Sequence, residues 1–147
     1  MNKIRELLKV KGNKVWSISL DTSVLEALQL MTDKKVGALL IVEDGKIAGI
    51  ISERDFVHGV AEKERCIVNT TVAEYMTPKV ITITPEQTVE ECMQLMTVQH
   101  IRHLPVVEND DLVGIISIGD IVKEIISNEK SRSDALENYI QGRGYGQ

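Results

Sequence analysis

Two short segments of the chain place a hydroxyl and a carboxylate three residues apart. Ser52 and Asp55 form the first pair and Ser117 and Asp120 the second, and each pair follows Gly-Ile-Ile. A carboxylate can accept hydrogen bonds from the two vicinal hydroxyls of a ribose, and a helix N-terminus beside it offers N–H groups to an oxyanion. The same spacing is that of a capping box, which closes the end of a helix. Spacing alone therefore leaves ribose binding and helix capping equally open.

Basic side chains are distributed unequally around these two pairs. Arg102 and His103 stand where the first segment has Gly37 and Ala38, whereas Arg54 stands where the second has a glycine. Phosphate oxygens would explain the cluster, because Arg forms paired charged hydrogen bonds with them. An ion pair with Asp or Glu across an interface is the alternative.

The composition excludes several classes of function. The chain has 147 residues, a formal charge of −5 and 43% hydrophobic but only 3% aromatic residues. Nucleic-acid binding needs a basic face, and base stacking needs aromatic side chains, so we expect no nucleic-acid partner. No apolar run has the length of a membrane span or of a signal peptide. The sequence therefore predicts a cytoplasmic protein without a membrane partner.

The residues that most often bind metals do not form a convincing set. Cys66 and Cys92 lack the CxxC spacing and are expected to be reduced thiols, with Cys92 buried on a helix face. His100 and His103 could share a metal at i, i+3, but no third ligand is near them in the sequence. We expect no metal and no required cofactor.

The chain contains an internal repeat. Residues 14–57 align without a gap to residues 79–122, and 18 of the 44 pairs are identical. Apolar residues recur at helical spacing at Val24, Leu28 and Met31, and Asp44-Gly45 separates two apolar runs as a hairpin turn does. The predicted order is β-α-β-β-α in each repeat, with an extended segment at 15–18, strands at 39–42 and 47–52 and closing helices at 54–61 and 120–126.

This order predicts an α/β chain (α+β in some schemes) in which two repeats pack with pseudo-twofold symmetry, because a unit of about 60 residues buries little surface alone. The predicted boundaries are 1–67 for the first repeat with its N-terminal helix and the start of the linker, 68–127 for the second repeat, and 128–147 for a tail. Within the tail we expect a helix at 134–140 and a loose Gly-rich end. Gly142 to Gly146 is not a phosphate loop, since no strand precedes it and no helix follows it.

The repeat order, the paired Gly-Ile-Ile-Ser-x-x-Asp segments and the Arg102-His-Leu-Pro-Val106 segment resemble the cystathionine β-synthase (CBS) domain. Two such domains in tandem resemble a Bateman module, over residues 4–127. Val15-Trp-Ser-Ile18, Ser52-Glu-Arg-Asp55 and Ser117-Ile-Gly-Asp120 are most similar to stand-alone CBS-pair proteins of bacteria and plant organelles. The resemblance implies a dimer that binds AMP, ADP or ATP, or else NAD(H) or S-adenosylmethionine, in clefts between the paired domains.

The resemblance also implies the binding residues. One cleft would use Ser117 and Asp120 with the backbone around the proline and the first extended segment of the other repeat, namely Ile101, Arg102, His103, Leu104, Pro105, Lys14, Val15, Trp16 and Ser17. The second cleft would use Val36, Gly37, Ala38, Ser52, Arg54, Asp55, Thr77, Val80 and Ile81. Leu40 stands where the second repeat has Pro105, so the Asp120 cleft is the preferred one. Trp16 either anchors the core or an interface, or lines the adenine pocket.

No Walker loop, Gly-x-Ser-x-Gly elbow or plausible Cys-His pair is present, so we expect no catalysis. The leading hypothesis is a non-catalytic nucleotide or energy sensor that passes its ligand state to an unidentified partner protein. The alternatives are a structural dimerisation module without a physiological ligand, and a redox-linked regulator of thioredoxin-type proteins.

Overall fold

The computed structural model describes residues 2–140, with side chains described as far as residue 130. The chain divides into two compact units. Residues 14–82 form the first, called here the Asp55 unit; of the described residues, 2–13 together with 83–140 form the second, the Asp120 unit. The predicted repeat boundaries follow chain order, but the compact units do not. The segment 68–82, predicted to begin the second repeat, belongs to the Asp55 unit, and α1 (Ile4–Lys11), predicted to begin the first repeat, belongs to the Asp120 unit.

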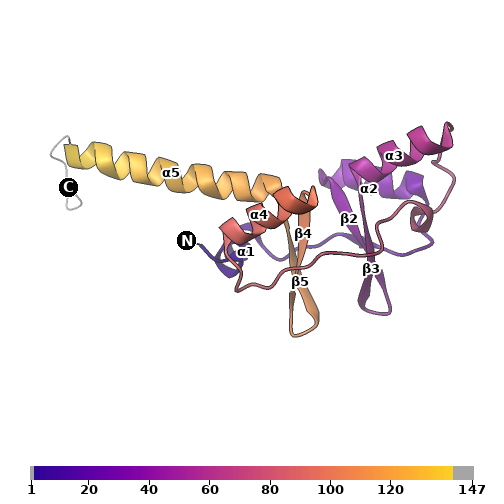
Figure 1. The fold of residues 1–147 in the computed structure, drawn as a ribbon, viewed down its shortest axis with the longest axis horizontal. Coiled ribbons are helices and arrows are strands. Elements are labelled where there is room, and N and C mark those ends of the chain that lie inside the picture. The colour runs from indigo at the N-terminus through magenta and orange to yellow at the C-terminus, as the bar shows by residue number, and fades with distance from the viewer. Residues whose placement is uncertain (1, 141–147) are drawn as a thin grey trace. The chain divides into compact units, whose positions relative to one another are not determined.

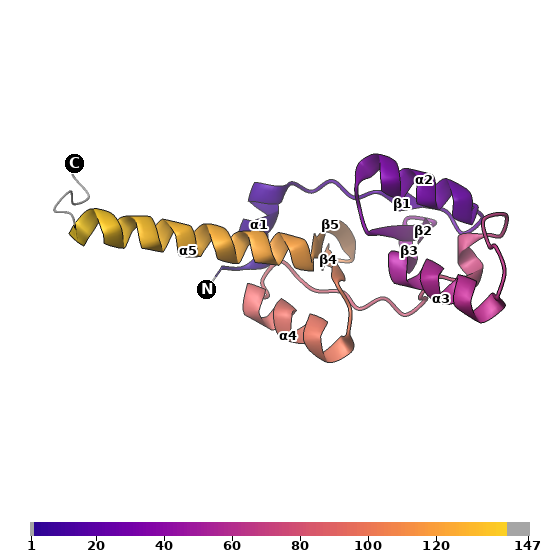
Figure 2. The same ribbon diagram turned by 90° about the horizontal axis from the view of Figure 1, so that it is seen from above.

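The Asp55 unit has a three-stranded sheet in the order β1-β2-β3, with β1 parallel and β3 antiparallel to β2. Seen from above, α2 and α3 lie on either side of the strands (Figure 2). The elements are β1 (Ser17–Ile18), α2 (Val24–Lys34), β2 (Ala38–Glu43), β3 (Lys46–Ser52), α3 (Glu53–Lys63) and the 3₁₀ helix η1 (Val72–Glu74). This unit confirms the predicted order β-α-β-β-α.

Local chemistry explains these elements. The Ser23 hydroxyl accepts from the Glu26 N–H at 3.1 Å and caps α2. Asp44 and Gly45 have φ of 50° and 77°, the left-handed pair that a two-residue hairpin turn requires. The apolar faces of these elements share one core, which contains Val24, Ala27, Met31, Leu39, Ile41, Ile51, Phe56, Ile67 and Val72.

The Asp120 unit is built around the hairpin of β4 and β5 (Figure 1). Its elements are α1 (Ile4–Lys11), α4 (Val89–Gln99), β4 (His103–Glu108), β5 (Asp111–Ser117) and α5 (Ile118–Ile140). Backbone bonds attach α1 to this unit: the Ile4 N–H donates to the Gln87 carbonyl and the Arg5 N–H to the Pro85 carbonyl, both at 2.9 Å. Its buried apolar residues include Ile4, Leu7, Leu8, Ile83, Val89, Cys92, Met96, Leu104, Val106, Ile116 and Ile121.

The first strand of the second repeat is shorter than its counterpart. In the Asp55 unit, Leu40 donates its N–H to the Trp16 carbonyl at 3.4 Å, which helps join β2 to β1. Pro105 occupies the equivalent position in β4 and has no N–H to donate. The pairing there is reduced to an isolated bridge at Ile83, which donates to the Pro105 carbonyl and accepts from Val107.

The C-terminal prediction of two separate helices is wrong. α5 runs without a break from Ile118 to Ile140 and projects beyond the β4–β5 hairpin (Figure 1). The polar residues 127–133 contain neither proline nor glycine, so nothing in them stops a helix that has already begun. The Gly-rich segment from Gly142 to Gly146 lies outside the described residues.

Candidate functional site

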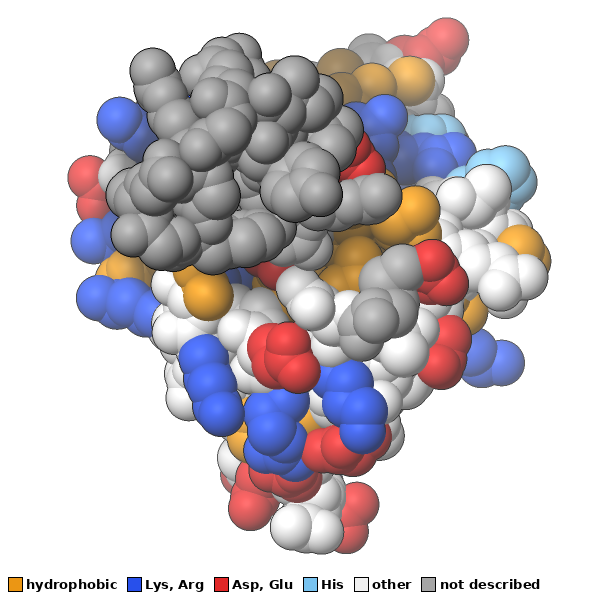
Figure 3. Space-filling view, turned by 90° about the vertical axis from the view of Figure 1, so that its left-hand side faces the viewer, with side chains coloured by type: hydrophobic (Ala, Val, Ile, Leu, Met, Phe, Trp, Pro, Cys, Tyr) orange, Lys and Arg blue, Asp and Glu red, His pale blue; other side chains and the backbone are white. Residues whose placement is uncertain are grey.

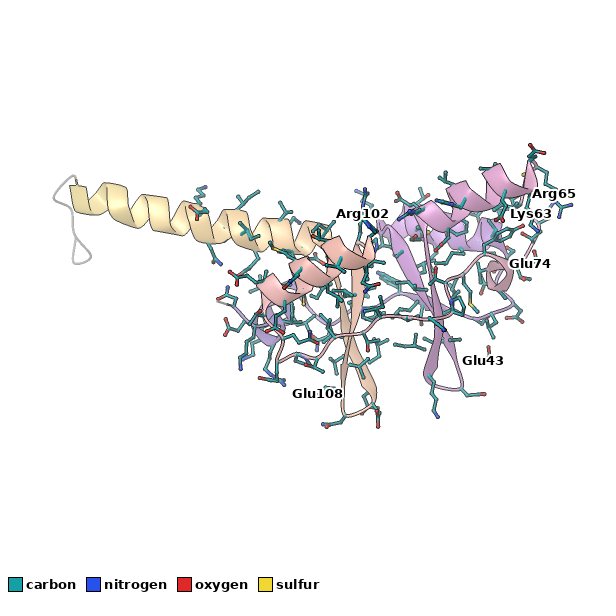
Figure 4. All side chains as sticks on the ribbon, viewed as in Figure 1. Glu43, Lys63, Arg65, Glu74, Arg102 and Glu108 are labelled. Carbon is teal, nitrogen blue, oxygen red and sulfur yellow. The ribbon has the colours of Figure 1, made fainter. Side chains whose placement is uncertain are left out.

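The Ser117 and Asp120 pair lies where β5 passes into α5. Ser117 is paired across the hairpin with His103, and the Ile118 N–H donates to the Arg102 carbonyl at 2.9 Å. Figure 4 shows Arg102 at this end of the hairpin and Glu108 at the other. The predicted pair is therefore next to the predicted basic residues, because the strand register brings the start of β4 opposite the end of β5.

The Asp120 carboxylate makes three contacts through a single oxygen. Oδ2 accepts from the Ser117 N–H at 2.8 Å and from the Ser117 hydroxyl at 2.9 Å, and it lies 2.6 Å from the Lys11 ammonium. The Asp120 N–H in turn donates to the Ser117 hydroxyl, at 3.2 Å. The capping box is thus formed, and none of these contacts uses Oδ1, which can still accept hydrogen bonds from a ligand.

Opposing effects act on the pKa of Asp120. Partial burial alone would raise it, but the Lys11 ammonium and the two Ser117 donors stabilise the anion more strongly. The pKa of Asp120 is consequently held below its ordinary value, and the carboxylate remains an acceptor at neutral pH.

Lys11 is a site residue that sequence reasoning missed. It is the last residue of α1, and its ammonium also donates to the Ile115 carbonyl in β5. The available signal was the similarity of the two segments that precede the repeats. Leu8 and Met76 align in these segments, and they cover the equivalent glycines Gly114 and Gly49.

The Ser52 and Asp55 pair lies at the equivalent position in the Asp55 unit, where β3 passes into α3. Asp55 Oδ2 accepts from the Ser52 N–H at 2.8 Å and from the Ser52 hydroxyl at 3.2 Å, and a capping box closes α3. The second carboxylate oxygen, Oδ1, accepts from the Thr77 hydroxyl at 3.4 Å. Ala38 pairs with Ser52, and the Gly37 carbonyl accepts from Glu53, so these predicted residues are brought together.

The remaining predicted residues are less directly placed. Val36 follows α2 and donates to the Met31 carbonyl, and Ile101 follows α4 and donates to the Met96 carbonyl. Arg54 Nε lies 3.4 Å from His58 Nε2. Leu104 and Pro105 are buried within β4, and Val80 and Ile81 are in a segment without regular structure.

Lys14, Val15, Trp16 and Ser17 belong to the Asp55 unit rather than to the unit of Asp120. The half-buried Trp16 ring packs against the core, and the ammonium groups of Lys14 and Lys34 lie 4.6 and 4.5 Å from its centre. These contacts favour the anchoring role of Trp16, with two cation–π interactions on its ring.

Surface ion pairs hold α1 on the Asp120 unit. Figure 3 shows Lys and Arg side chains interleaved with Asp and Glu on one face. Lys3 and Arg5 reach Glu86 at 3.1 and 2.7 Å, and Arg5 also bonds to Glu108. The hydrogen bonds that Arg5 donates to Glu108 and to Glu86 raise the pKa of Arg5, and the bond to Glu86 lowers the pKa of Glu86. These exposed pairs position the helix that carries Lys11.

Among the described residues, no group of three or more His, Cys, Asp or Glu side chains could hold a metal ion. None of the described helices is long and apolar enough to cross a membrane. Cys66 is exposed and Cys92 is buried, and both are free thiols.

Comparison with known proteins identifies the repeats. The CBS domain model matches residues 5–62 and 72–127. The chain is 39% identical to the mitochondrial CBS domain-containing protein CBSX3 of Arabidopsis thaliana, over 97% of this chain and 73% of that protein. It is 34% identical to the CBS domain-containing protein YhcV of Bacillus subtilis, over 85% and 88% respectively. Since CBSX3 is mitochondrial, a cytoplasmic location stays a prediction.

Solved structures give the same result. A putative signal-transduction protein with CBS domains from Burkholderia ambifaria has a TM-score of 0.82 and 41% identity, over 86% of this chain and 95% of that chain. A CBS domain pair in complex with 5′-methylthioadenosine and S-adenosyl-L-methionine has a TM-score of 0.76 and 25% identity, over 87% and 98%. The two matched repeats and these relatives show that the chain belongs to the CBS domain family, as a tandem pair.

Proposed function

We propose that this protein is a non-catalytic regulatory module that binds an adenosine ligand, with the ribose hydroxyls on the Asp120 carboxylate. The observation that carries the proposal is the use of Oδ2 alone by the capping box and Lys11. A carboxylate held in this way is pre-oriented, and its second oxygen can accept from both vicinal hydroxyls without opening the end of α5. The family relative solved with two adenosine compounds supports the choice of ligand class.

Asp120 is preferred over Asp55 as the ribose acceptor. Both oxygens of Asp55 are in contact with neighbouring side chains, since Thr77 approaches Oδ1 while Ser52 occupies Oδ2. A ribose at Asp55 would have to displace or share the Thr77 contact. We therefore propose one preferred ligand position, with AMP, ADP, ATP and NAD(H) as the candidate ligands and Arg102 and His103 within the same end of the hairpin.

Isothermal titration calorimetry with adenosine, AMP, ADP, ATP, NAD and NADH tests the proposal. The Asp120→Asn variant keeps the shape of the side chain but removes its charge, and we expect affinity to fall by about tenfold to a hundredfold. Asp111→Asn is the matched control, because Asp111 is an exposed carboxylate in the same hairpin. Absence of heat for every ligand would contradict the function. A loss confined to Asp55→Asn would move the site to the other repeat.

We also propose that the protein forms a homodimer through α5. The described part of α5 exposes Ile118, Val122, Ile125 and Ile126, at 38 to 60% of their surface, and these positions recur at helical spacing. An exposed apolar stripe of this kind is typical of a protein interface. A hexameric CBS-CP12 protein from cyanobacteria, at 26% identity, shows that a relative is oligomeric. A ligand that favours one arrangement of such a dimer could alter its contacts with a regulated protein.

A further inference from the structure

Lys11 and Thr77 contact equivalent groups in the two repeats, although they do not align in the segments that precede the repeats. In the Asp55 unit, Thr77 donates its N–H to the Ile50 carbonyl at 2.8 Å and its hydroxyl to Asp55 at 3.4 Å. In the Asp120 unit, the Lys11 ammonium donates to the Ile115 carbonyl and lies 2.6 Å from Asp120. The same two acceptors, a strand carbonyl and the capping carboxylate, are therefore met by a neutral residue in one repeat and by a cation in the other.

The Lys11 ammonium is held in position. Its two acceptors come from β5 and from the first turn of α5, and the side chains of Lys11 and Asp120 are only 29% and 20% exposed. An ammonium has three N–H donors, and these two bonds use two of them. The third remains for another acceptor beside the capping carboxylate.

The ion pair changes the electrostatic character of the ribose position. An unpaired carboxylate would repel a phosphate attached to the same ribose, whereas the Lys11–Asp120 pair has no net charge and offers a positive pole. At Asp55, the equivalent contact is a neutral hydroxyl and does not cancel the carboxylate charge. Charge at this position therefore favours different adenosine ligands in the two repeats.

We infer that Lys11 makes the Asp120 site selective for adenosine ligands that carry a phosphate, such as AMP, over neutral or cationic ones such as adenosine and S-adenosylmethionine. The inference rests on the proposed function, because it assumes that Asp120 binds the ribose. The alternative is a Lys11 that only anchors α1. An anchoring residue would change the affinity for AMP and for adenosine by the same factor.

The test measures the ratio of the dissociation constants of adenosine and AMP by calorimetry. All proteins carry Asp55→Asn, so that the Asp120 site alone reports. Lys11→Met removes the charge, and Lys11→Gln removes it while keeping a donor for the Ile115 carbonyl. Lys11→Arg retains the charge. Lys9→Met is the matched control, because Lys9 is an exposed lysine on the same helix.

We expect Lys11→Met and Lys11→Gln to reduce the preference for AMP by about tenfold, because the attraction lost is that of one charge at short range. Lys9→Met and Lys11→Arg should retain it. A preference that stays within about twofold of its starting value in both neutral variants would overturn the inference while leaving the proposed function intact. If neither ligand binds before Lys11 is changed, the proposed function fails as well.

Discussion

The contact between α1 and β5 can be tested by exchanging a methyl group across it. A Cβ at Gly114 would lie 2.7 Å from Leu8 Cδ2 and 3.3 Å from Cδ1, inside the usual carbon contact distance of about 3.5–4.0 Å. Gly114→Ala should therefore destabilise the protein by about 1–3 kcal/mol through overpacking. The gain of about 0.5–1 kcal/mol from replacing a strand glycine offsets part of this cost.

The partner change is Leu8→Ala. Leu8 is only 6% exposed, so its truncation should cost about 2–5 kcal/mol. In the double variant, the new methyl group occupies space that Leu8 has left and no longer meets it. We expect the destabilisation of the double variant to be smaller than the sum of the two single destabilisations by about 1–3 kcal/mol. Urea unfolding followed by circular dichroism gives the four free energies that the cycle needs.

Gly49 supplies the control cycle. A Cβ there would meet Met76 Sδ at 2.6 Å and the Thr77 carbonyl at 3.0 Å, so Gly49→Ala acts within the Asp55 unit. Combined with Leu8→Ala it should be additive within about 0.5 kcal/mol. Additivity of the Gly114 and Leu8 pair to the same degree would refute their contact. The placement of Lys11, three residues after Leu8 on α1, would then lose its basis.

Three further outcomes are expected. The lowered pKa of Asp120 means that its contribution to stability is present above the ordinary carboxyl value of 3.8 and is lost as the pH falls through the lower folded value. Asp120→Asn should thus lower the urea midpoint at neutral pH but hardly at strongly acidic pH, and an equal loss at both would contradict the argument. Burial raises the pKa of Cys92 to about 11, so a thiol reagent should label Cys66 first and Cys92 only on unfolding. Val122→Glu combined with Ile126→Glu should convert the proposed dimer to a monomer in light scattering, whereas a dimer that survives would exclude this face of α5.

Patterns within one segment predicted most of the fold. Asp44-Gly45 predicted the first hairpin, and the i, i+4, i+7 spacing from Val24 predicted the buried face of α2. Both features depend on residues that are close in sequence. The packing of α1 with the second repeat depends instead on bonds to residues more than seventy positions away, including those to Pro85 and Gln87. No periodicity within α1 encodes such a partner.

The candidate site likewise has parts that local sequence predicted and parts that only the fold shows. The capping boxes follow from a three-residue spacing, and the register of β4 with β5 places His103 opposite Ser117. Only the similarity of the segments that precede the two repeats pointed toward α1, and its Lys11 was missed because the charge has a meaning only beside Asp120, which is distant in sequence. Pro105 shows the intermediate case: its missing N–H was readable, but the reduction of the adjoining strand to a bridge at Ile83 required the structure.

The double role of Asp120 determines which experiment carries most weight. The carboxylate closes the end of α5 and, in the proposed function, also binds ribose, so Asp120→Asn can reduce affinity either by removing an acceptor or by loosening the helix. Lys11 does not belong to the capping box. A ratio of two ligands measured on one variant cancels any loss of folded protein, because both affinities fall by the same fraction. The Lys11 comparison therefore separates binding from folding where substitution of the carboxylate cannot.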